Sequence, residues 1–341
     1  MPHISKKKLI YKIGPQLKQY LRQYGRKSKI PIHYADLKSF KESIALYDKK
    51  GKDTLWETCI YSPEDMQVIH KNLLMLYALL KVGGDMQVVD HLAVDRIDSC
   101  LYGNTLPFRI RIVNKMNDNF DYFYIKNADA SRIYGLELEH LLSPNRISYL
   151  VSGSTLIEEH IAGIPGDEFI KNYVGGNNFN GTRIAKEFVK FNERCFVRLL
   201  GDMHSSNFVV QITPDFDETN YRIRAMDFDQ QSFEGRKNIY LPQFYKQNKV
   251  FLELVQQYIK PESLLQYQRE ERSLMIGRIK AARWPIQNLL DAMSSDEIAP
   301  MANVISLREE LSAYYKSKRF LRARNMGELL RASLLHLLKK K

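Results

Sequence analysis

The stretch Gly201-Asp202-Met203-His204-Ser205-Ser206-Asn207 gathers polar side chains in one short segment, and a strand-like run, Phe208-Val209-Val210, follows it. A second strand-like run, residues 221–226, ends in Asp227-Phe228-Asp229. Carboxylate and amide oxygens at the tips of two adjacent strands form the kind of oxygen-rich pocket that suits Mg²⁺. This stretch therefore predicts a strand pair that carries a candidate metal site at one end.

Upstream of this stretch, the hydrophobic pattern has the period of β-strands. Turn signals, Asn117-Asp118-Asn119 and Ser152-Gly153, separate short runs that alternate or are rich in aromatic residues. A short helix over residues 131–142 is expected between the two resulting hairpins, which are 108–113 with 120–125 and 147–151 with 155–161. Strands that cluster apart from helices favour an α+β fold over alternating βαβ units.

The regions on either side of these hairpins are predicted to be helical. Ser62-Pro63-Glu64-Asp65 has the hydroxyl, proline and acid of a helix N-terminus, and Gly83-Gly84 ends the apolar periodicity that follows. From about residue 181 onward, everything except residues 208–228 is also expected to be helical. We therefore expect three parts: a mostly helical basic region over 1–95, a β-rich lobe over 96–161, and a helical lobe over 162–341 with the two polar loops.

The formal net charge of the 341-residue chain is +12, and the positive charge is concentrated at its ends. Residues 1–35 carry +9 and residues 316–341 carry +8, which leaves −5 for the middle of the +12 chain. Basic ends attract polyanions such as anionic lipid or inositol polyphosphates. Solvated helix faces that only maintain solubility explain the same pattern. No zinc-finger spacing, RNP signature or heptad repeat occurs, so we expect no sequence-specific nucleic-acid binding.

The composition, 44% hydrophobic and 26% charged, is that of a globular protein. The longest apolar run, residues 73–80, is far shorter than the roughly 18 residues that span a bilayer, and no secretory signal is expected after Lys6-Lys7-Lys8. The three cysteines, Cys59, Cys100 and Cys195, fit neither a disulfide framework nor a zinc cluster. We therefore expect a reducing, cytoplasmic setting and no transmembrane segment.

The order Asp-x-x-x-x-Asn, strand pair, Asp-Phe-Asp resembles the catalytic and metal-binding loops of the protein-kinase-like superfamily. It looks closest to the aminoglycoside phosphotransferase and choline kinase branch. The resemblance implies that Asp202 orients and deprotonates an acceptor hydroxyl, and that Asn207 and Asp227 hold Mg²⁺ against nucleotide phosphates, with Asp229 as a further ligand. Leu200 departs from the histidine or tyrosine usual in the family. Asp229 departs from the glycine of protein kinases, which favours the small-molecule-kinase branch.

Upstream positions extend the resemblance to about residues 98–260. Lys126 ends the second strand of the first hairpin, where the family has the lysine that contacts nucleotide phosphates. Glu137 would be its partner, and Glu139 is the alternative. Residues 156–163 resemble the linker between the lobes, whose backbone, at Glu159 and Ile161, would hydrogen-bond adenine. No Gly-x-Gly-x-x-Gly occurs, and residues 102–105 are the only candidate for a phosphate-covering turn.

The implied protein is an atypical kinase with a two-lobed protein-kinase-like α+β fold, a helical N-terminal extension and a helical C-terminal lobe. It would use ATP and Mg²⁺, or Mn²⁺ instead, to move the γ-phosphate to a hydroxyl of a protein or small molecule. The chain also resembles divergent bacterial effector kinases, which modify host proteins. A protein acceptor and delivery into a host cytosol are therefore further expectations. The alternative is a catalytically silent, pseudokinase-like module that recruits anionic lipid or another polyanion. In a combined version, an inositol polyphosphate bridges the basic ends and modulates activity.

Other motifs fit other functions less well. Residues 176–182 mimic a P-loop but lack its lysine. Gly201-Asp202-Met203-His204 is similar to the Asp-x-His of metallophosphoesterases, but their other ligand motifs do not occur, so His204 is interpreted as a loop-organising residue. An amphipathic helix over 326–341 is expected to pack on the helical lobe, with an anionic membrane surface as the alternative. Five basic residues around another predicted helix, before Trp284-Pro285, either form an anion pocket with the terminal lysines or face solvent: Arg269, Arg272, Arg278, Lys280 and Arg283.

Overall fold

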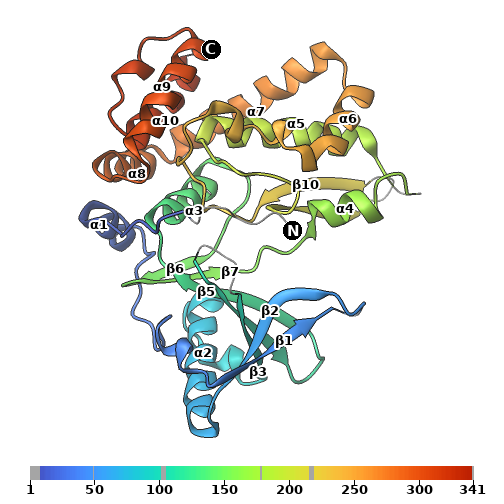
Figure 1. Cartoon of the computed structure of the whole chain (residues 1–341), viewed down its shortest axis with the longest axis vertical. Helices are drawn as coiled ribbons and strands as arrows, with labels where there is room; N and C mark the ends of the chain where they lie inside the picture. The colour runs from blue at the N-terminus through green and yellow to red at the C-terminus, as the bar shows by residue number, and fades with distance from the viewer. Residues whose placement is uncertain (1–7, 49, 101–104, 177–178, 215–218, 340–341) are drawn as a thin grey trace. The chain divides into compact units, whose positions relative to one another are not determined.

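The computed structural model describes residues 8–339 except 49, 101–104, 177–178 and 215–218. The chain combines α-helices with a large antiparallel sheet and a small one (Figure 1). It divides into two compact units, and each is described here by itself. Unit 1 comprises Met1–Ala130 and Ile147–His160, and unit 2 comprises Ser131–Arg146 and Ile161–Lys341. The expected α+β class is confirmed.

A seven-stranded sheet forms the centre of unit 1. Every neighbouring pair is antiparallel, and the order is β1-β2-β3-β4-β5-β7-β6. The strands are β1 (Glu42–Tyr47), β2 (Asp53–Ile60), β3 (Leu92–Cys100), β4 (Phe108–Asn114), β5 (Phe120–Asn127), β6 (Tyr149–Ser152) and β7 (Thr155–Glu159). The two predicted hairpins are β4–β5 and β6–β7, and both are confirmed. Their turns contain the left-handed residues that the sequence supplies, Asp118 (φ 56°) and Gly153 (φ 59°).

Helix α2 (Pro63–Val82) covers one face of this sheet. It begins and ends as predicted, because the Ser62 hydroxyl accepts a hydrogen bond from the Asp65 amide and Gly83 takes φ 66°. Its apolar stripe, which includes Leu73 and Leu76, packs in one core with sheet residues such as Ile110. Unit 1 also contains α1 (Pro15–Gln23), η1 (Asp36–Ser39) and η2 (Met86–Val89).

The prediction of a mostly helical region over residues 1–95 is wrong for the segment that forms β1, β2 and the start of β3. These strands belong to the same sheet as the predicted hairpins. The cause is visible in the burial of β1, which is exposed at five of its six positions. A strand with solvent on both faces lacks the apolar alternation by which sequence reasoning finds strands. The turn that joins β1 to β2 is built around the Asp48 carboxylate, which accepts hydrogen bonds from the amides of Lys50 and Lys52.

Unit 2 combines a small antiparallel sheet with a helical layer. The sheet has the order β10-β9-β8, and its strands are β8 (Ile164–Pro165), β9 (Phe208–Pro214) and β10 (Thr219–Ala225). The α-helices are α3 (Ala130–Leu142), α4 (Gly166–Asn172), α5 (Gly181–Arg198), α6 (Lys249–Tyr258), α7 (Pro261–Ala281), α8 (Arg283–Ser295), α9 (Met301–Tyr315) and α10 (Met326–Lys339). Short 3₁₀ helices are η3 (Lys237–Tyr240), η4 (Pro242–Phe244), η5 (Lys246–Asn248) and η6 (Phe320–Arg322).

Helix α5 is the central element of unit 2. Its aromatic face is buried, and Phe188 stacks on Phe251 of α6 with a centroid distance of 5.1 Å. Phe251 in turn contacts Phe208 of β9 at 5.6 Å, which fixes the start of that strand against the helices. The loop between α5 and β9 is therefore held at its β9 end by packed aromatic side chains.

Helix α10 packs on other helices of unit 2, as the sequence predicts. It contacts α5 and α8, and its buried apolar side chains are Met326, Leu329, Leu330, Leu334 and Leu337. Its apolar face is thus covered by protein. Among the described residues, no helix combines the length and apolarity that crossing a membrane requires.

Candidate functional site

Asp202 and Asn207 lie in the loop that follows α5. The chain leaves the helix through Leu199 in a left-handed conformation (φ 55°), and Asp202 adopts the same region (φ 59°). Such backbone angles cost free energy for residues with side chains and are concentrated at functional sites. The Asn207 amide group donates to the Asp202 carbonyl at 2.8 Å and lies 3.4 Å from its Oδ2. Asn207 is therefore fixed by Asp202 through its nitrogen, which leaves its oxygen, Oδ1, as an acceptor.

Asp227 and Asp229 follow β10, the strand paired with β9. The Met226 amide donates to the Asn207 carbonyl at 3.0 Å, so the two loops are joined directly where the strands end. The Asp229 amide donates to Asp227 Oδ1, also at 3.0 Å. The expected strand pair, with Asn207 and Asp227 at the same end of it, is confirmed.

Arg132 on α3 is a residue of this site that the sequence analysis did not identify. Its Nη1 lies 2.8 Å from Asp227 Oδ1 and 2.8 Å from Asp229 Oδ1, and its side chain is 3% exposed. The Ser131 hydroxyl anchors the same helix by donating to the Gln231 carbonyl at 2.8 Å. At Gly135 a Cβ would lie 2.9 Å from Phe228 Cβ, so α3 packs tightly against the Asp227 loop. An arginine near a helix start gives no sequence signal of such a role.

Burial and neighbouring acidic side chains both disfavour the ionised form of Asp202. The pKa of Asp202 is raised to about 7, first by burial and then by the negative charges of Asp227, Glu234 and Asp229. The hydrogen bond from Asn207 acts in the opposite direction. Asp202 therefore titrates near neutrality, where a carboxylate can accept a proton and still be regenerated. Glu234 is a second residue that the sequence analysis missed.

His204 and Tyr245 shape the Asp202 loop. The Ser206 amide donates to His204 Nδ1 at 3.3 Å, and burial lowers the pKa of His204. The Tyr245 hydroxyl accepts a hydrogen bond from the Asp202 amide at 2.9 Å. Within the described part of the chain, no three His, Cys, Asp or Glu side chains are placed to hold a metal ion. His204 Nδ1 is thus used within the loop itself, which fits a loop-organising role.

The oxygen donors fit a divalent ion with few protein ligands. Asp227 Oδ1 accepts hydrogen bonds from Arg132 and from the Asp229 amide. Asp227 Oδ2 and Asn207 Oδ1 have no hydrogen bond among the described residues. One carboxylate and one amide oxygen match Mg²⁺, which usually keeps several waters and shares its shell with substrate phosphates. Asp229, the further ligand that the resemblance implies, is more buried: its side chain is 9% exposed, and its Oδ1 pairs with Arg132.

The positions predicted for nucleotide binding divide between the two units. In unit 1, Lys126 Nζ lies 2.8 Å from Glu158 Oε2, and the Glu159 amide donates to the Ser148 carbonyl. The Glu159 N–H is therefore used within the sheet and does not remain for adenine. In unit 2, Glu137 and Ile161 are buried. The candidate phosphate-covering turn, 102–105, lies outside the described residues except for Thr105, which is buried.

Glu139, the alternative partner for Lys126, has a structural role. Its carboxylate pairs with the buried guanidinium of Arg198 and accepts hydrogen bonds from the Ser143 hydroxyl (2.6 Å) and the Asn145 amide (3.1 Å). These contacts tie the end of α3 to α5. Glu139 therefore belongs to the framework of unit 2.

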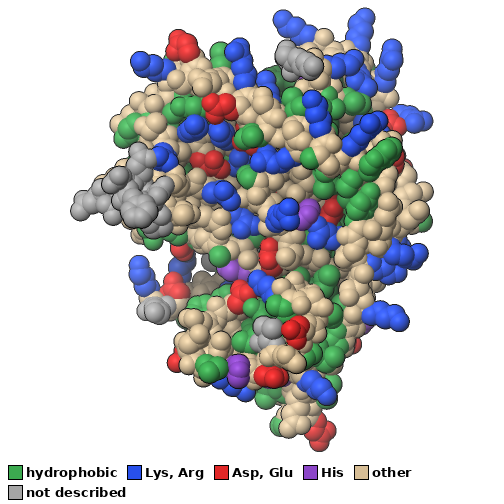
Figure 2. Space-filling view, turned by 180° about the vertical axis from the view of Figure 1, so that it is seen from behind, with side chains coloured by type: hydrophobic (Ala, Val, Ile, Leu, Met, Phe, Trp, Pro, Cys, Tyr) green, Lys and Arg blue, Asp and Glu red, His purple; other side chains and the backbone are tan. Residues whose placement is uncertain are grey.

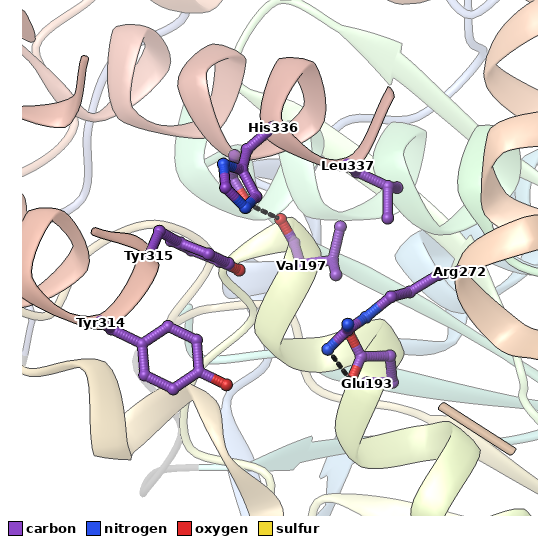
Figure 3. A pocket seen from close by; sticks show the side chains of 8 residues that line it. Glu193, Val197, Arg272, Tyr314, Tyr315, His336 and Leu337 are labelled. Atoms are coloured by element: carbon purple, nitrogen blue, oxygen red, sulfur yellow. Dashed lines mark hydrogen bonds and ion pairs between the residues drawn. The ribbon is translucent and has the colours of Figure 1, made fainter. Parts of the chain in front are cut away.

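A separate cavity of about 320 Å³ lies among α5, α7, α9 and α10 (Figure 3). Its lining includes Tyr314, Tyr315 and His336, and the Arg272–Glu193 ion pair (2.6 Å) closes one side. None of the acidic residues around Asp202 lines it. No protein-family model matches the chain, and no curated protein matches it.

Proposed function

We propose that this protein is an ATP- and Mg²⁺-dependent phosphotransferase that uses a hydroxyl as acceptor. The observation that carries the proposal is the joining of the Asp202–Asn207 loop to the Asp227 loop through the hydrogen bond from the Met226 amide to the Asn207 carbonyl. Asn207 Oδ1 and Asp227 Oδ2 would hold the divalent ion. When bound, that ion would neutralise the phosphate oxygens of the nucleotide.

Asp202 would act as the general base in this reaction. The acceptor oxygen forms a bond to the γ-phosphorus, the bond from that phosphorus to the β,γ-bridging oxygen breaks, and ADP leaves. The acceptor proton passes to the Asp202 carboxylate, whose pKa of about 7 suits both uptake and release near neutral pH. The left-handed backbone at Asp202 and the hydrogen bond from its amide to Tyr245 fix the start of the loop before any substrate binds.

The test is transfer of label from γ-labelled ATP by the full chain, with Mg²⁺ or Mn²⁺ and either a protein extract or its small-molecule fraction. Asp202→Asn should reduce the transfer rate by about 100-fold or more, the order typical of a lost general base. Asp291→Asn is the matched control, because Asp291 is an exposed surface residue that pairs with Arg331. Equal rates in Asp202→Asn and the wild type would refute the proposed role of Asp202.

The second candidate function is a silent module that binds an anionic surface, and two observations favour it. The Arg132 guanidinium already pairs with both Asp227 and Asp229. In addition, residues 316–324 expose five cations and contain no acid: Lys316, Lys318, Arg319, Arg322 and Arg324. Figure 2 shows Lys and Arg side chains projecting from the C-terminal helices, at the upper right of that view. Binding to anionic vesicles without any nucleotide turnover would favour this function.

A further inference from the structure

A second cavity of unit 2 is lined mainly by polar and charged side chains. It has a volume of about 490 Å³ and lies among α5, α7 and the β9–β10 pair, with Pro144 at its edge. Four cationic side chains line it, Lys190, Arg194, Arg222 and Arg278, against two carboxylates, Glu187 and Glu271. The lining therefore has a net charge of +2. It shares no residue with the Asp202 site or with the cavity of Figure 3.

Both carboxylates of the lining form ion pairs with the same cation, Arg194. Arg194 is 3% exposed, and it lies 2.7 Å from Glu187 and 3.4 Å from Glu271. Arg194 also donates to the Ile223 carbonyl of β10 at 3.2 Å. Lys190 reaches a carboxylate outside the lining, that of Glu270, at 3.1 Å. The base of the cavity is thus a fixed ionic network that joins α5, α7 and β10.

Arg222 and Arg278 are held much less firmly. The exposed Arg222 has no carboxylate within ion-pair distance among the described residues, and Arg278 has only a long contact of 3.9 Å with Glu271. Arg278 Nη1 is buried without a hydrogen-bond partner in the described part of the chain. Burial lowers the pKa of Arg278, and the neighbouring charges of Arg194 and Arg222 lower it further against the opposing effect of Glu271. A bound anion would relieve this repulsion and give both guanidinium groups acceptors.

The cavity is also much larger than one anion needs. A water molecule occupies about 30 Å³ of liquid, so 490 Å³ has room for a ring or chain beside a phosphate group. Polar side chains line the remainder, among them Thr213, Gln211 and Tyr221. The Gln211 nitrogen donates to the Ala162 carbonyl at 2.9 Å, which leaves its amide oxygen for a ligand, and the Tyr221 hydroxyl accepts from the Asn180 amide at 3.2 Å. The planar guanidinium group matches two phosphate oxygens at once, which makes arginine well suited to phosphate esters.

We propose that this cavity binds a soluble phosphate monoester of a small polyhydroxylated molecule, with Arg222 and Arg278 on the phosphate. The site is independent of the proposed phosphotransfer. The cavity is walled by two helices and a strand pair, which favours a soluble molecule over a headgroup that stays in a membrane.

The test is isothermal titration of the full chain at low salt with inorganic phosphate, glucose 6-phosphate and inositol 1-phosphate. The phosphorylated polyols should bind more tightly than inorganic phosphate, because they also use the hydroxyl-binding lining. Arg222→Gln, which removes an exposed side chain without an ion pair, should weaken their binding about tenfold or more. Arg222→Gln with Arg278→Gln should abolish it, with folding checked by circular dichroism. Arg269→Gln is the matched control, because Arg269 is an exposed arginine of α7 that does not line the cavity.

Two further arms separate this site from the alternatives. Asp227→Asn should leave binding of the phosphorylated polyols unchanged, whereas a loss there would place the ligand at the Asp202 site and overturn the proposal. Vesicles that contain a phosphatidylinositol phosphate test whether the cavity binds the phosphate of a lipid headgroup instead of that of a soluble molecule. If the wild type bound these vesicles but none of the soluble ligands, and the double variant lost vesicle binding, the proposal of a soluble ligand would be overturned. Absence of binding in the wild type, or equal binding in the double variant, would overturn the site.

Discussion

Asp202 ionises in an environment that disfavours its negative charge. Because the pKa of Asp202 is raised in the folded protein to about 7, the ionised form costs stability above pH 7, and this cost disappears as the pH falls through 7 toward 4. We predict that Asp202→Asn raises the free energy of unfolding at pH 8 by about 1–2 kcal/mol, a value reduced to allow for the 42% exposure of the carboxylate.

The same substitution should have almost no effect on stability at pH 4. Urea denaturation at the two pH values measures both effects. An equal change at pH 4 and pH 8 would show that neither burial nor the neighbouring acids oppose the charge of Asp202. For the wild type, the raised pKa also predicts a phosphotransfer rate that increases with pH through about 7.

Arg132 pairs with two carboxylates at once, which predicts a large cost for its removal. Arg132→Met leaves Asp227 and Asp229 without their common partner and should lower the free energy of unfolding by about 3 kcal/mol. Because a divalent ion can supply the missing positive charge, Mg²⁺ should raise the melting temperature of this variant more than that of the wild type. Thermal denaturation with and without Mg²⁺ tests this, and an unchanged melting temperature for the metal-free variant would contradict the role of Arg132.

At the scale of elements, the contact between α8 and α10 depends on a glycine. A Cβ at Gly327 would lie 2.4 Å from the backbone of Met293, and neither backbone can move without disturbing its helix. We predict that Gly327→Ala lowers the free energy of unfolding by about 2 kcal/mol or more. Gly277→Ala is the matched control: nothing lies within 4 Å of a Cβ at that position of α7, so alanine should stabilise the helix by up to about 1 kcal/mol. Equal effects of the two changes on urea denaturation would contradict this account of the packing.

The elements differ in how far the sequence foretells them. The β4–β5 hairpin and α2 were predictable because their apolar residues follow a clear period and their ends carry Asp118, Ser62 and Gly83. Strand β1 was not, because its side chains face solvent.

The candidate site was also predictable only where a local sequence pattern marks its residues. Asp202, Asn207 and Asp227 are marked by their spacing around a strand pair, whereas Arg132 reaches Asp227 from a helix 95 residues away in the sequence. No local pattern encodes that contact. The burial that raises the pKa of Asp202 also depends on tertiary packing and is not visible in the spacing of the motif.

At the scale of the molecule, the exposed basic segment over residues 316–324 predicts binding to anionic surfaces. Replacement of Lys316, Lys318, Arg319 and Arg322 by glutamine should weaken binding to phosphatidylserine vesicles, at about 1 kcal/mol for each cation that reaches the surface. The control variant loses the same amount of charge from unit 1, by replacement of four exposed lysines with glutamine: Lys41, Lys50, Lys52 and Lys115. Vesicle co-sedimentation at low and high salt distinguishes the two, and equal losses would mean that net charge alone attracts the chain.

The central claim is that Asn207 and Asp227 hold a divalent ion beneath a bound nucleotide. Its most direct test is titration of ATP into the full chain with and without Mn²⁺, with the free ion followed by electron paramagnetic resonance. We predict uptake of Mn²⁺ together with ATP by the wild type and by Asp291→Asn, and its loss in Asp227→Asn. Uptake of Mn²⁺ and ATP by Asp227→Asn at wild-type affinity would contradict the claim.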